Sequence, residues 1–200
     1  LGIRAGETVG IIGGTGSGKS VVSRLLQEMG AVIVDADKIS RQIEEVDQPA
    51  YREIVKYFGK EILQEDGTIF RRKLGEIVFH DSEKLAFLNR CTHTYIVAKM
   101  QEQIAAVKAE GTAKCIVLDA PLLFEAGLEG FCDAVWVVYA DVDTRAKRIM
   151  ERDGVSYDLA LARISSQKTW DEYRALSDIV LDNSQDRNHL QEQLAIAWKT

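Results

Sequence analysis

The chain has 200 residues, of which 46% are hydrophobic and 28% are charged, and its formal net charge is −6. This composition is typical of one globular domain, with or without an inserted subdomain, that is large enough to bury a substantial core. It contains no apolar run of the roughly 20 residues that cross a membrane, and its acidic balance argues against nucleic acid as a partner, since a duplex binder needs a concentrated basic face.

The first predicted element is a short apolar strand over residues 9–12, and a glycine-rich loop follows it. Residues 13–20 read Gly-Gly-Thr-Gly-Ser-Gly-Lys-Ser, which matches the phosphate-binding loop pattern GxxxxGK[ST] in full. Glycines let successive backbone N–H groups turn toward a polyphosphate, and the helix opening at Ser20 points its N-terminus at the same phosphates. A merely flexible turn would leave Lys19 and Ser20 unexplained.

This loop predicts a site for a nucleoside triphosphate, with ATP as the default. Lys19 is placed to reach the β- and γ-phosphates, and the Ser20 hydroxyl is placed to bind Mg²⁺. The residues expected to contact the nucleotide are Gly14, Thr15, Gly16, Ser17, Gly18, Lys19, Ser20 and Val21.

Further apolar, β-branched runs follow along the chain, separated by stretches of helical periodicity. They cover residues 31–34, 115–118, 134–139 and 179–181. Short, nearly continuous apolar runs between helices are typical of a parallel sheet covered on both faces. The sequence therefore predicts an α/β fold: a five-stranded parallel sheet flanked by helices, of the phosphate-loop NTPase type found in nucleoside monophosphate kinases.

Two helical segments interrupt this alternation and suggest a division into parts. We expect a nucleotide-binding core of residues 1–46, 111–143 and 176–200, and a helical insertion over residues 47–110. Residues 144–175 are helical and rich in Arg and Lys, and they follow the fourth strand at the edge of the sheet that holds the loop. That position predicts a lid over the triphosphate.

Two carboxylates follow the second strand, in the sequence Val34-Asp35-Ala36-Asp37. On an extended segment, side chains two apart share a face, so one acid could accept a hydroxyl proton while the other positions that hydroxyl or binds the water shell of the metal. The alternative is that both are helix caps, because Asp favours the N-cap and a helix is expected from Lys38.

The third strand also ends in an acid, Asp119, which is placed to reach Mg²⁺, often through water. The apolar segment Pro121–Glu125 follows it. This segment predicts either a pocket for a flat or apolar acceptor group or ordinary core packing.

In the expected lid, Arg148 and Arg152 are four residues apart and share a helix face. A guanidinium brought by a closing lid would stabilise the charge that develops on the transferred phosphoryl group, and Arg148 is the first candidate. The alternative is a solvated charged face, with Glu151 and Asp153 as partners. The guanine-reading Asn-Lys-x-Asp and the Asp-x-x-Gly of a GTP switch do not occur in the sequence.

Together these motifs resemble the dephospho-coenzyme A kinase family over nearly the whole chain. The residues that carry the resemblance are the loop, Val34–Arg41, Asp66-Gly67 with Arg71, Leu74–Phe79, Asp119–Glu125, Arg163–Gln167 and Ser177–Asn183. The resemblance implies transfer of the γ-phosphoryl group of ATP to the ribose 3′-hydroxyl of dephospho-coenzyme A, the last step of coenzyme A synthesis.

The resemblance also implies roles for individual residues. Asp37 corresponds to the base, with Asp35 in support, and Arg148 to the lid arginine. Residues expected at the acceptor are Arg41, Arg71, Leu122 and Glu125, and Asn183 lies where the last strand approaches the adenine. Thr15 stands where the family commonly has Ile, and Val21 where a second hydroxyl is common.

The expected partner is a small molecule, dephospho-coenzyme A, with neither nucleic acid nor a membrane involved. Three widely spaced cysteines, Cys91, Cys115 and Cys132, predict reduced thiols in a cytoplasmic protein. We expect a monomer or a small homo-oligomer. The competing hypotheses are a kinase of a nucleoside monophosphate or a sugar, and a nucleotide-dependent binding switch without a small-molecule acceptor.

Overall fold

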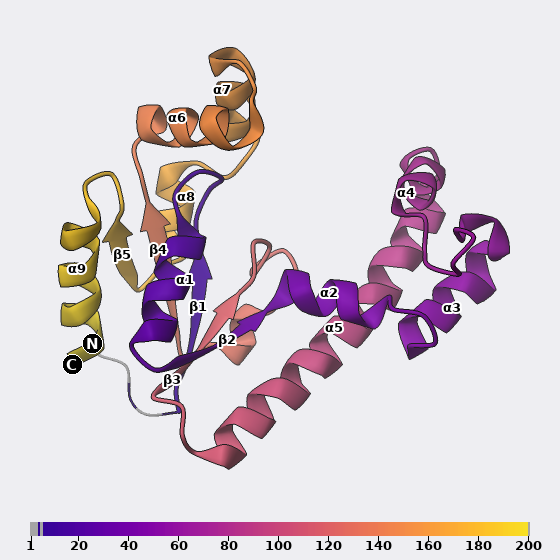
Figure 1. Cartoon of the computed structure of the whole chain (residues 1–200), viewed down its shortest axis with the longest axis horizontal. Helices are drawn as coiled ribbons and strands as arrows, with labels where there is room; N and C mark the ends of the chain where they lie inside the picture. Colours follow the sequence, from indigo (N-terminus) through magenta and orange to yellow (C-terminus); the bar gives the residue numbers. More distant parts are fainter. Residues whose placement is uncertain (1–3, 5, 200) are drawn as a thin grey trace. The chain divides into compact units, whose positions relative to one another are not determined.

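The computed structural model describes residue 4 and residues 6–199, so the outermost residues of the expected core lie outside the description. Within this part of the chain, five parallel strands form one sheet in the order β2-β3-β1-β4-β5 (Figure 1). The strands are β1 (Thr8–Ile12), β2 (Ala31–Asp35), β3 (Cys115–Asp119), β4 (Ala134–Tyr139) and β5 (Ile179–Asp182). They confirm the expected strands and the α/β class.

The described residues divide into two compact units. The larger unit contains the residues up to Val34 and those from Ala106 onward, and the smaller unit contains Asp35–Ala105. The smaller unit therefore begins at Asp35, whereas the sequence predicts that the helical insertion begins at residue 47. The segment expected to form a lid, residues 144–175, lies in the larger unit. Separate roles for these parts stay a prediction.

Helices of the larger unit connect and cover the strands. They are α1 (Lys19–Glu28), the 3₁₀ helix η2 (Glu129–Phe131), α6 (Val142–Asp153), α7 (Tyr157–Ser165), α8 (Trp170–Ala175) and α9 (Arg187–Lys199). No helix in the described part of the chain is both long and apolar enough to cross a membrane.

One face of the sheet is packed by α1 and α9. Leu26 of α1 and Leu190 and Leu194 of α9 are fully buried against inward-facing strand residues, among them Ile11 and Trp136. Alternate residues of each strand supply this layer, because side chains alternate across a sheet.

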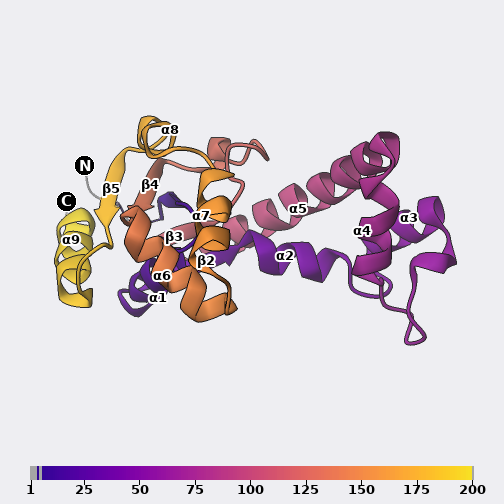
Figure 2. The same ribbon diagram turned by 90° about the horizontal axis from the view of Figure 1, so that it is seen from above.

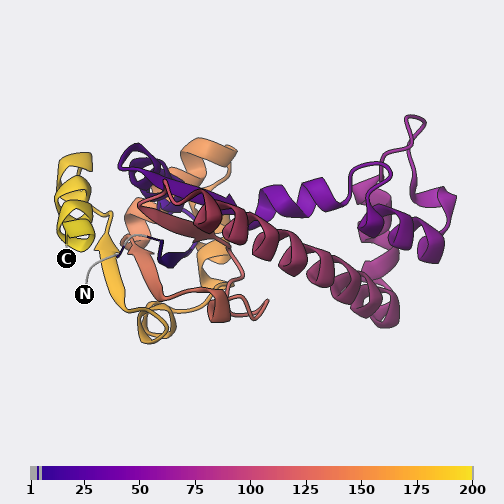
Figure 3. The same ribbon diagram turned by 90° about the horizontal axis from the view of Figure 1, so that it is seen from below.

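The opposite face of the sheet is packed differently. Helix α8 contacts β4 there, and Figures 2 and 3 show it across the sheet from α1. Gly10 of β1 also lies on this side, and a Cβ at that position would lie 2.8 Å from Leu123 Cδ2 and 2.9 Å from Cys132 Sγ. The loop that follows β3 therefore packs directly on the central strand.

The smaller unit is helical, as expected from residues 47–110. It contains α2 (Ala36–Ile43), α3 (Pro49–Phe58), the 3₁₀ helix η1 (Lys60–Ile62), α4 (Arg71–Phe79) and most of α5 (Ser82–Glu110). Proline occupies the first turn of α3, where its missing N–H costs nothing. The core of this unit is formed by Tyr51, Ile54, Phe58, Ile62, Ile69, Leu74, Val78 and Cys91.

The core packing predicts the effect of truncating one helix residue. Leu26→Ala removes a fully buried side chain from the layer between α1 and the sheet, and we expect it to lower the free energy of unfolding by about 2–5 kcal/mol. Leu159→Ala is the matched control, because Leu159 is 45% exposed, and it should cost less than about 1 kcal/mol. If urea denaturation gave both variants the same loss in the free energy of unfolding, that result would contradict the packing of Leu26 between α1 and the sheet.

Candidate active site

The site is built on the loop that joins β1 to α1. Gly18 is the N-cap of α1 in the left-handed region, with φ of 93°, and no side chain caps the helix. Gly16 also has a positive φ, of 81°. Among the described residues, no protein group accepts the N–H of Lys19 or of Ser20. These free donors at a helix N-terminus suit an anionic ligand.

The carbonyl groups of this loop accept hydrogen bonds from two residues, Arg148 of α6 and Asn183, which directly follows β5. The Asn183 side chain donates from Nδ2 to Ser17 O at 2.8 Å. The Arg148 guanidinium donates to Gly16 O at 3.2 Å, to Ser17 O at 3.3 Å and to Asn183 O at 2.8 Å. Because these bonds occupy the carbonyls, they fix the loop conformation that leaves the N–H groups available.

The sequence predicted Arg148 at the transferring phosphates and Asn183 at the adenine, and these roles stay predictions. The loop contacts of both residues were not foreseen. They join positions more than 130 residues apart in the chain, which no local pattern reveals.

Lys19 and Asp119 meet where β1 and β3 end. Lys19 Nζ lies 3.7 Å from Asp119 Oδ1, and both side chains are largely buried. The Ser23 hydroxyl donates to Asp119 Oδ2 at 2.9 Å and thereby orients the carboxylate. Ser23 was not among the predicted residues, although its spacing of four from Lys19 places both on one face of α1.

Thr15 forms hydrogen bonds with two residues of the segment 144–175, Arg145 and Gln167. Its N–H donates to Gln167 Oε1 at 2.8 Å, and its hydroxyl accepts from Gln167 Nε2 at 2.6 Å. Arg145 Nε donates to Thr15 O at 3.0 Å, and Arg145 Nη2 donates to Gln167 Oε1 at 3.0 Å. The predicted site contained Thr15 but neither Arg145 nor Gln167.

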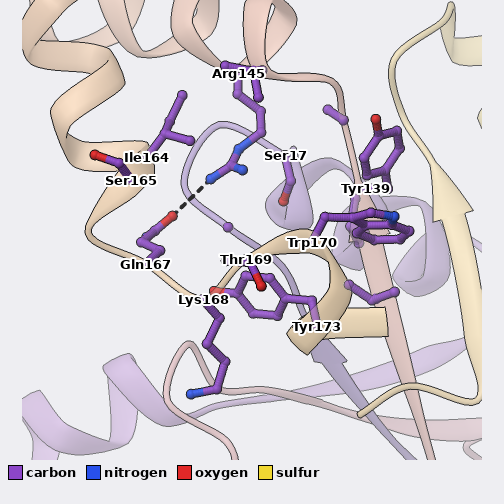
Figure 4. Close-up of a pocket in the computed structure, with 15 residues that line it drawn as sticks. Ser17, Tyr139, Arg145, Ile164, Ser165, Gln167, Lys168, Thr169, Trp170 and Tyr173 are labelled. Carbon is purple, nitrogen blue, oxygen red and sulfur yellow. Dashed lines mark hydrogen bonds between the residues drawn. The ribbon is translucent and has the colours of Figure 1, made fainter. Parts of the chain in front are cut away.

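A cavity of about 350 Å³ lies beside these contacts (Figure 4). Its walls combine the aromatic residues Tyr139, Trp170 and Tyr173 with Gly14 and Ser17 of the loop. Arg145 and Gln167 also line it, and the dashed line in Figure 4 marks the bond between them. The cavity can therefore admit a ligand that is partly flat and partly polar.

The segment after β3 supplies two of the predicted acceptor residues. Leu123 is buried, so the core-packing interpretation of this apolar segment holds for that residue, whereas its neighbour Leu122 is 63% exposed and its role at the acceptor stays a prediction. Glu125 forms an ion pair with Lys168, and this bond lowers the pKa of Glu125.

In the smaller unit, the two carboxylates have different surroundings. Asp35 is the N-cap of α2, and its Oδ1 accepts from the N–H of Lys38 at 2.9 Å. Asp37 lies in the first turn of α2 and is exposed. The expected extended segment with both acids on one face is wrong, because the helix begins at Ala36. The capping alternative holds for Asp35 and leaves Asp37 available.

The two arginines of this unit that are predicted to bind the acceptor, Arg41 and Arg71, have different surroundings. Arg71, the first residue of α4, pairs with Glu44 through Nη2 and Oε2 at 2.8 Å. Burial raises the pKa of Glu44, and Arg71 opposes that rise. Arg41 lies in the last turn of α2 and is exposed.

No cluster of three or more His, Cys, Asp or Glu side chains suited to a metal ion occurs in the described part of the chain. The oxygen groups at the loop that could hold a metal ion are the hydroxyl of Ser20, at the start of α1, and the carboxylate of Asp119. A divalent cation bound there would take most of its remaining ligands from phosphates and water, which is usual for Mg²⁺.

Comparison with known proteins places this geometry in a family. The family model described as dephospho-CoA kinase matches residues 7–189. The chain belongs to the dephospho-CoA kinase family. A dephospho-CoA kinase of Carboxydothermus hydrogenoformans is 46% identical over 93% of this chain and 90% of that protein. One of Listeria innocua is 42% identical over 94% of each chain.

Solved structures agree with this assignment. TT1252 from Thermus thermophilus has a TM-score of 0.79 and 30% identity, and the match covers 96% of this chain and 95% of that one. A dephospho-CoA kinase from Campylobacter jejuni has a TM-score of 0.70 and 28% identity over 94% of each chain. Shikimate kinase from Acinetobacter baumannii, at 16% identity and a TM-score of 0.50 over 95% of this chain and 92% of its own, shares the fold alone.

The bracing of the loop predicts the effect of a nearly isosteric change. Asn183→Asp replaces the Nδ2 donor with a carboxylate oxygen that faces Ser17 O, at a side chain only 6% exposed. We expect a loss of about 1–3 kcal/mol in the free energy of unfolding, because a buried acceptor loses its donor. Asn188→Asp makes the same chemical change at an exposed position of α9 and should stay within about 0.5 kcal/mol of the parent protein. Denaturant unfolding that gave both variants the same stability would contradict the bracing role.

Proposed function

We propose that this member of the dephospho-CoA kinase family transfers the γ-phosphoryl group of Mg²⁺-bound ATP to the ribose 3′-hydroxyl of dephospho-CoA, giving CoA and ADP. The observation that carries the proposal is the glycine loop with its free N–H groups beside the Lys19–Asp119 pair. Family membership directs the transfer to dephospho-CoA.

On the donor side, the free N–H groups at the start of α1 and the ammonium group of Lys19 bind the β- and γ-phosphate oxygens. Ser20 and Asp119 fit Mg²⁺, because the Ser20 hydroxyl is exposed at the helix start and Ser23 orients the Asp119 carboxylate. When bound, Mg²⁺ neutralises charge on the bridged phosphates. Arg148 donates three of its five N–H groups to backbone carbonyls, which leaves two donors for the transferring phosphate that it is predicted to contact.

On the acceptor side, Asp37 accepts the proton of the 3′-hydroxyl as its oxygen attacks the γ-phosphorus. The bond from that phosphorus to the β–γ bridging oxygen breaks, and ADP leaves. Exposure of Asp37 at the N-terminal turn of α2 supports this assignment, since the carboxylate is not committed to a cap. Arg41, Arg71, Leu122 and Glu125 are proposed to bind the remainder of the acceptor, and Asp35 supports Asp37 by fixing the start of α2.

We also propose a cytoplasmic location and a monomer or small homo-oligomer, with neither a nucleic acid nor a membrane as a partner. Support for the location comes from the cysteines. Cys91, Cys115 and Cys132 are all free, and burial raises the pKa of Cys115 and of Cys132 to about 12, so both remain unreactive thiols.

Substitution of the proposed base tests the mechanism. Asp37→Asn removes the proton acceptor while keeping the size of the side chain, so the variant should fold and bind ATP but lose turnover by roughly 100-fold or more. Asp47→Asn is the matched control in the same unit, because Asp47 is exposed and Asn tolerates its φ of 68°. Turnover of Asp37→Asn close to that of Asp47→Asn would remove Asp37 from the role of base.

The choice of acceptor separates this function from the competing hypotheses. ADP release should depend on added dephospho-CoA and stay at background with AMP, adenosine or simple sugars. Release with AMP or a sugar instead would favour another small-molecule kinase. Release independent of any acceptor would favour a binding switch.

A further inference from the structure

Arg145 is a half-buried cation that forms no ion pair with any carboxylate in the described part of the chain. Burial lowers the pKa of its guanidinium, and its hydrogen bonds go to neutral oxygens, Thr15 O and Gln167 Oε1. A desolvated guanidinium prefers an anionic acceptor, because charge-assisted bonds are about twice as strong as neutral ones. The protein supplies none here.

The Gln167 carboxamide oxygen lies where two donors converge. It accepts from the N–H of Thr15 at 2.8 Å and from Arg145 Nη2 at 3.0 Å. One of these donors belongs to the phosphate-binding loop and the other is a cation. This pair would bind a negatively charged oxygen more strongly than a neutral carboxamide.

The loop is shaped to let Arg145 approach. A Cβ at Gly14 would overlap Arg145 Nη2, and a Cβ at Gly16 would lie 2.7 Å from Arg145 O. The cavity of about 350 Å³ opens at the same place, since Gly14, Arg145 and Gln167 line it. Ser17 also lines the cavity, and its fully buried hydroxyl has no hydrogen-bond partner among the described residues.

We infer that Arg145 and the Thr15 N–H form an additional binding position for a phosphate oxygen of the donor nucleotide, and that the Gln167 carboxamide occupies this position in the structure. The inference rests on the proposed function for its ligand. The donor is the ligand because Thr15 belongs to the loop that holds the donor phosphates, so an oxygen bound to its N–H lies on the same polyphosphate.

This arrangement gives Arg145 and Gln167 opposite effects on nucleotide affinity. Arg145→Gln removes the charge but keeps hydrogen-bonding capacity, and it should weaken nucleotide binding about tenfold to a hundredfold. Gln167→Ala removes the group that the phosphate oxygen displaces. Because a larger fraction of the protein is then ready to bind, affinity should rise by about twofold to tenfold. Arg145→Lys keeps the charge and should lie between Arg145→Gln and the parent protein.

Calorimetric titration of the full chain with Mg²⁺ and a non-hydrolysable ATP analogue tests this inference. Weaker binding by Arg145→Gln together with tighter binding by Gln167→Ala supports it. Weakening in both variants would mean that the contacts only hold the loop in shape, and Arg145→Gln within twofold of the parent protein would mean that no phosphate oxygen binds there. Either result overturns the inference.

Two controls keep the outcomes distinct. If the parent protein does not bind the analogue at all, the proposed function fails rather than this inference. Titration with dephospho-CoA should give the same affinity for Arg145→Gln and for the parent protein, and a loss confined to dephospho-CoA would overturn the assignment to the donor. If Arg145→Gln lacks the circular dichroism of the folded protein, Gln167→Ala and Arg145→Lys decide, and weaker binding by Gln167→Ala rejects the inference.

Discussion

The proposed donor site depends on one constraint: a short stretch of backbone must leave its N–H groups free for an anion while its carbonyls are bound elsewhere. Backbone carbonyls repel phosphate, so a glycine loop without outside support would spend much of its time in conformations that bind poorly. Asn183, directly after β5, and Arg148 of α6 bind the carbonyls of Gly16 and Ser17, and Arg145 of α6 binds that of Thr15. The parallel sheet makes this possible, because it brings the ends of β1, β3, β4 and β5 to the same edge.

The same constraint gives two arginines of α6 a structural role that does not depend on the reaction, because both bind carbonyls of the loop. Arg145 and Arg148 are three residues apart on α6 and reach the loop at adjacent positions. Neither forms an ion pair with a carboxylate in the described part of the chain, so both keep their charge available beside the proposed position of the phosphates. Phosphoryl transfer depends mainly on such prearranged charge, since the reaction itself requires little covalent participation from the protein.

Sequence patterns were sufficient to predict those features of the fold and the site that depend on neighbouring residues in the chain. The loop octapeptide, the five apolar strands and Asp119 at the end of β3 all follow from neighbouring residues. The extended arrangement of Asp35 and Asp37 was wrong because Asp35 caps α2 and the helix starts one residue later. The contacts of Thr15 with Gln167 were beyond reach for a different reason: 152 residues separate them, and only the tertiary fold brings them together. Thr15 departs from the Ile that the resemblance leads one to expect, and its hydroxyl accepts a hydrogen bond from Gln167 Nε2.

The proposed reaction uses a donor site in the larger unit and an acceptor carboxylate in the smaller unit. Its outcome is defined by the bond that forms. Phosphorus-31 NMR of the product from ATP, Mg²⁺ and dephospho-CoA tests it most directly. We predict a new phosphate monoester on the ribose 3′-oxygen, formed together with ADP. A phosphate at another position, or ADP without any phosphorylated acceptor, would contradict the proposed transfer to the ribose 3′-hydroxyl.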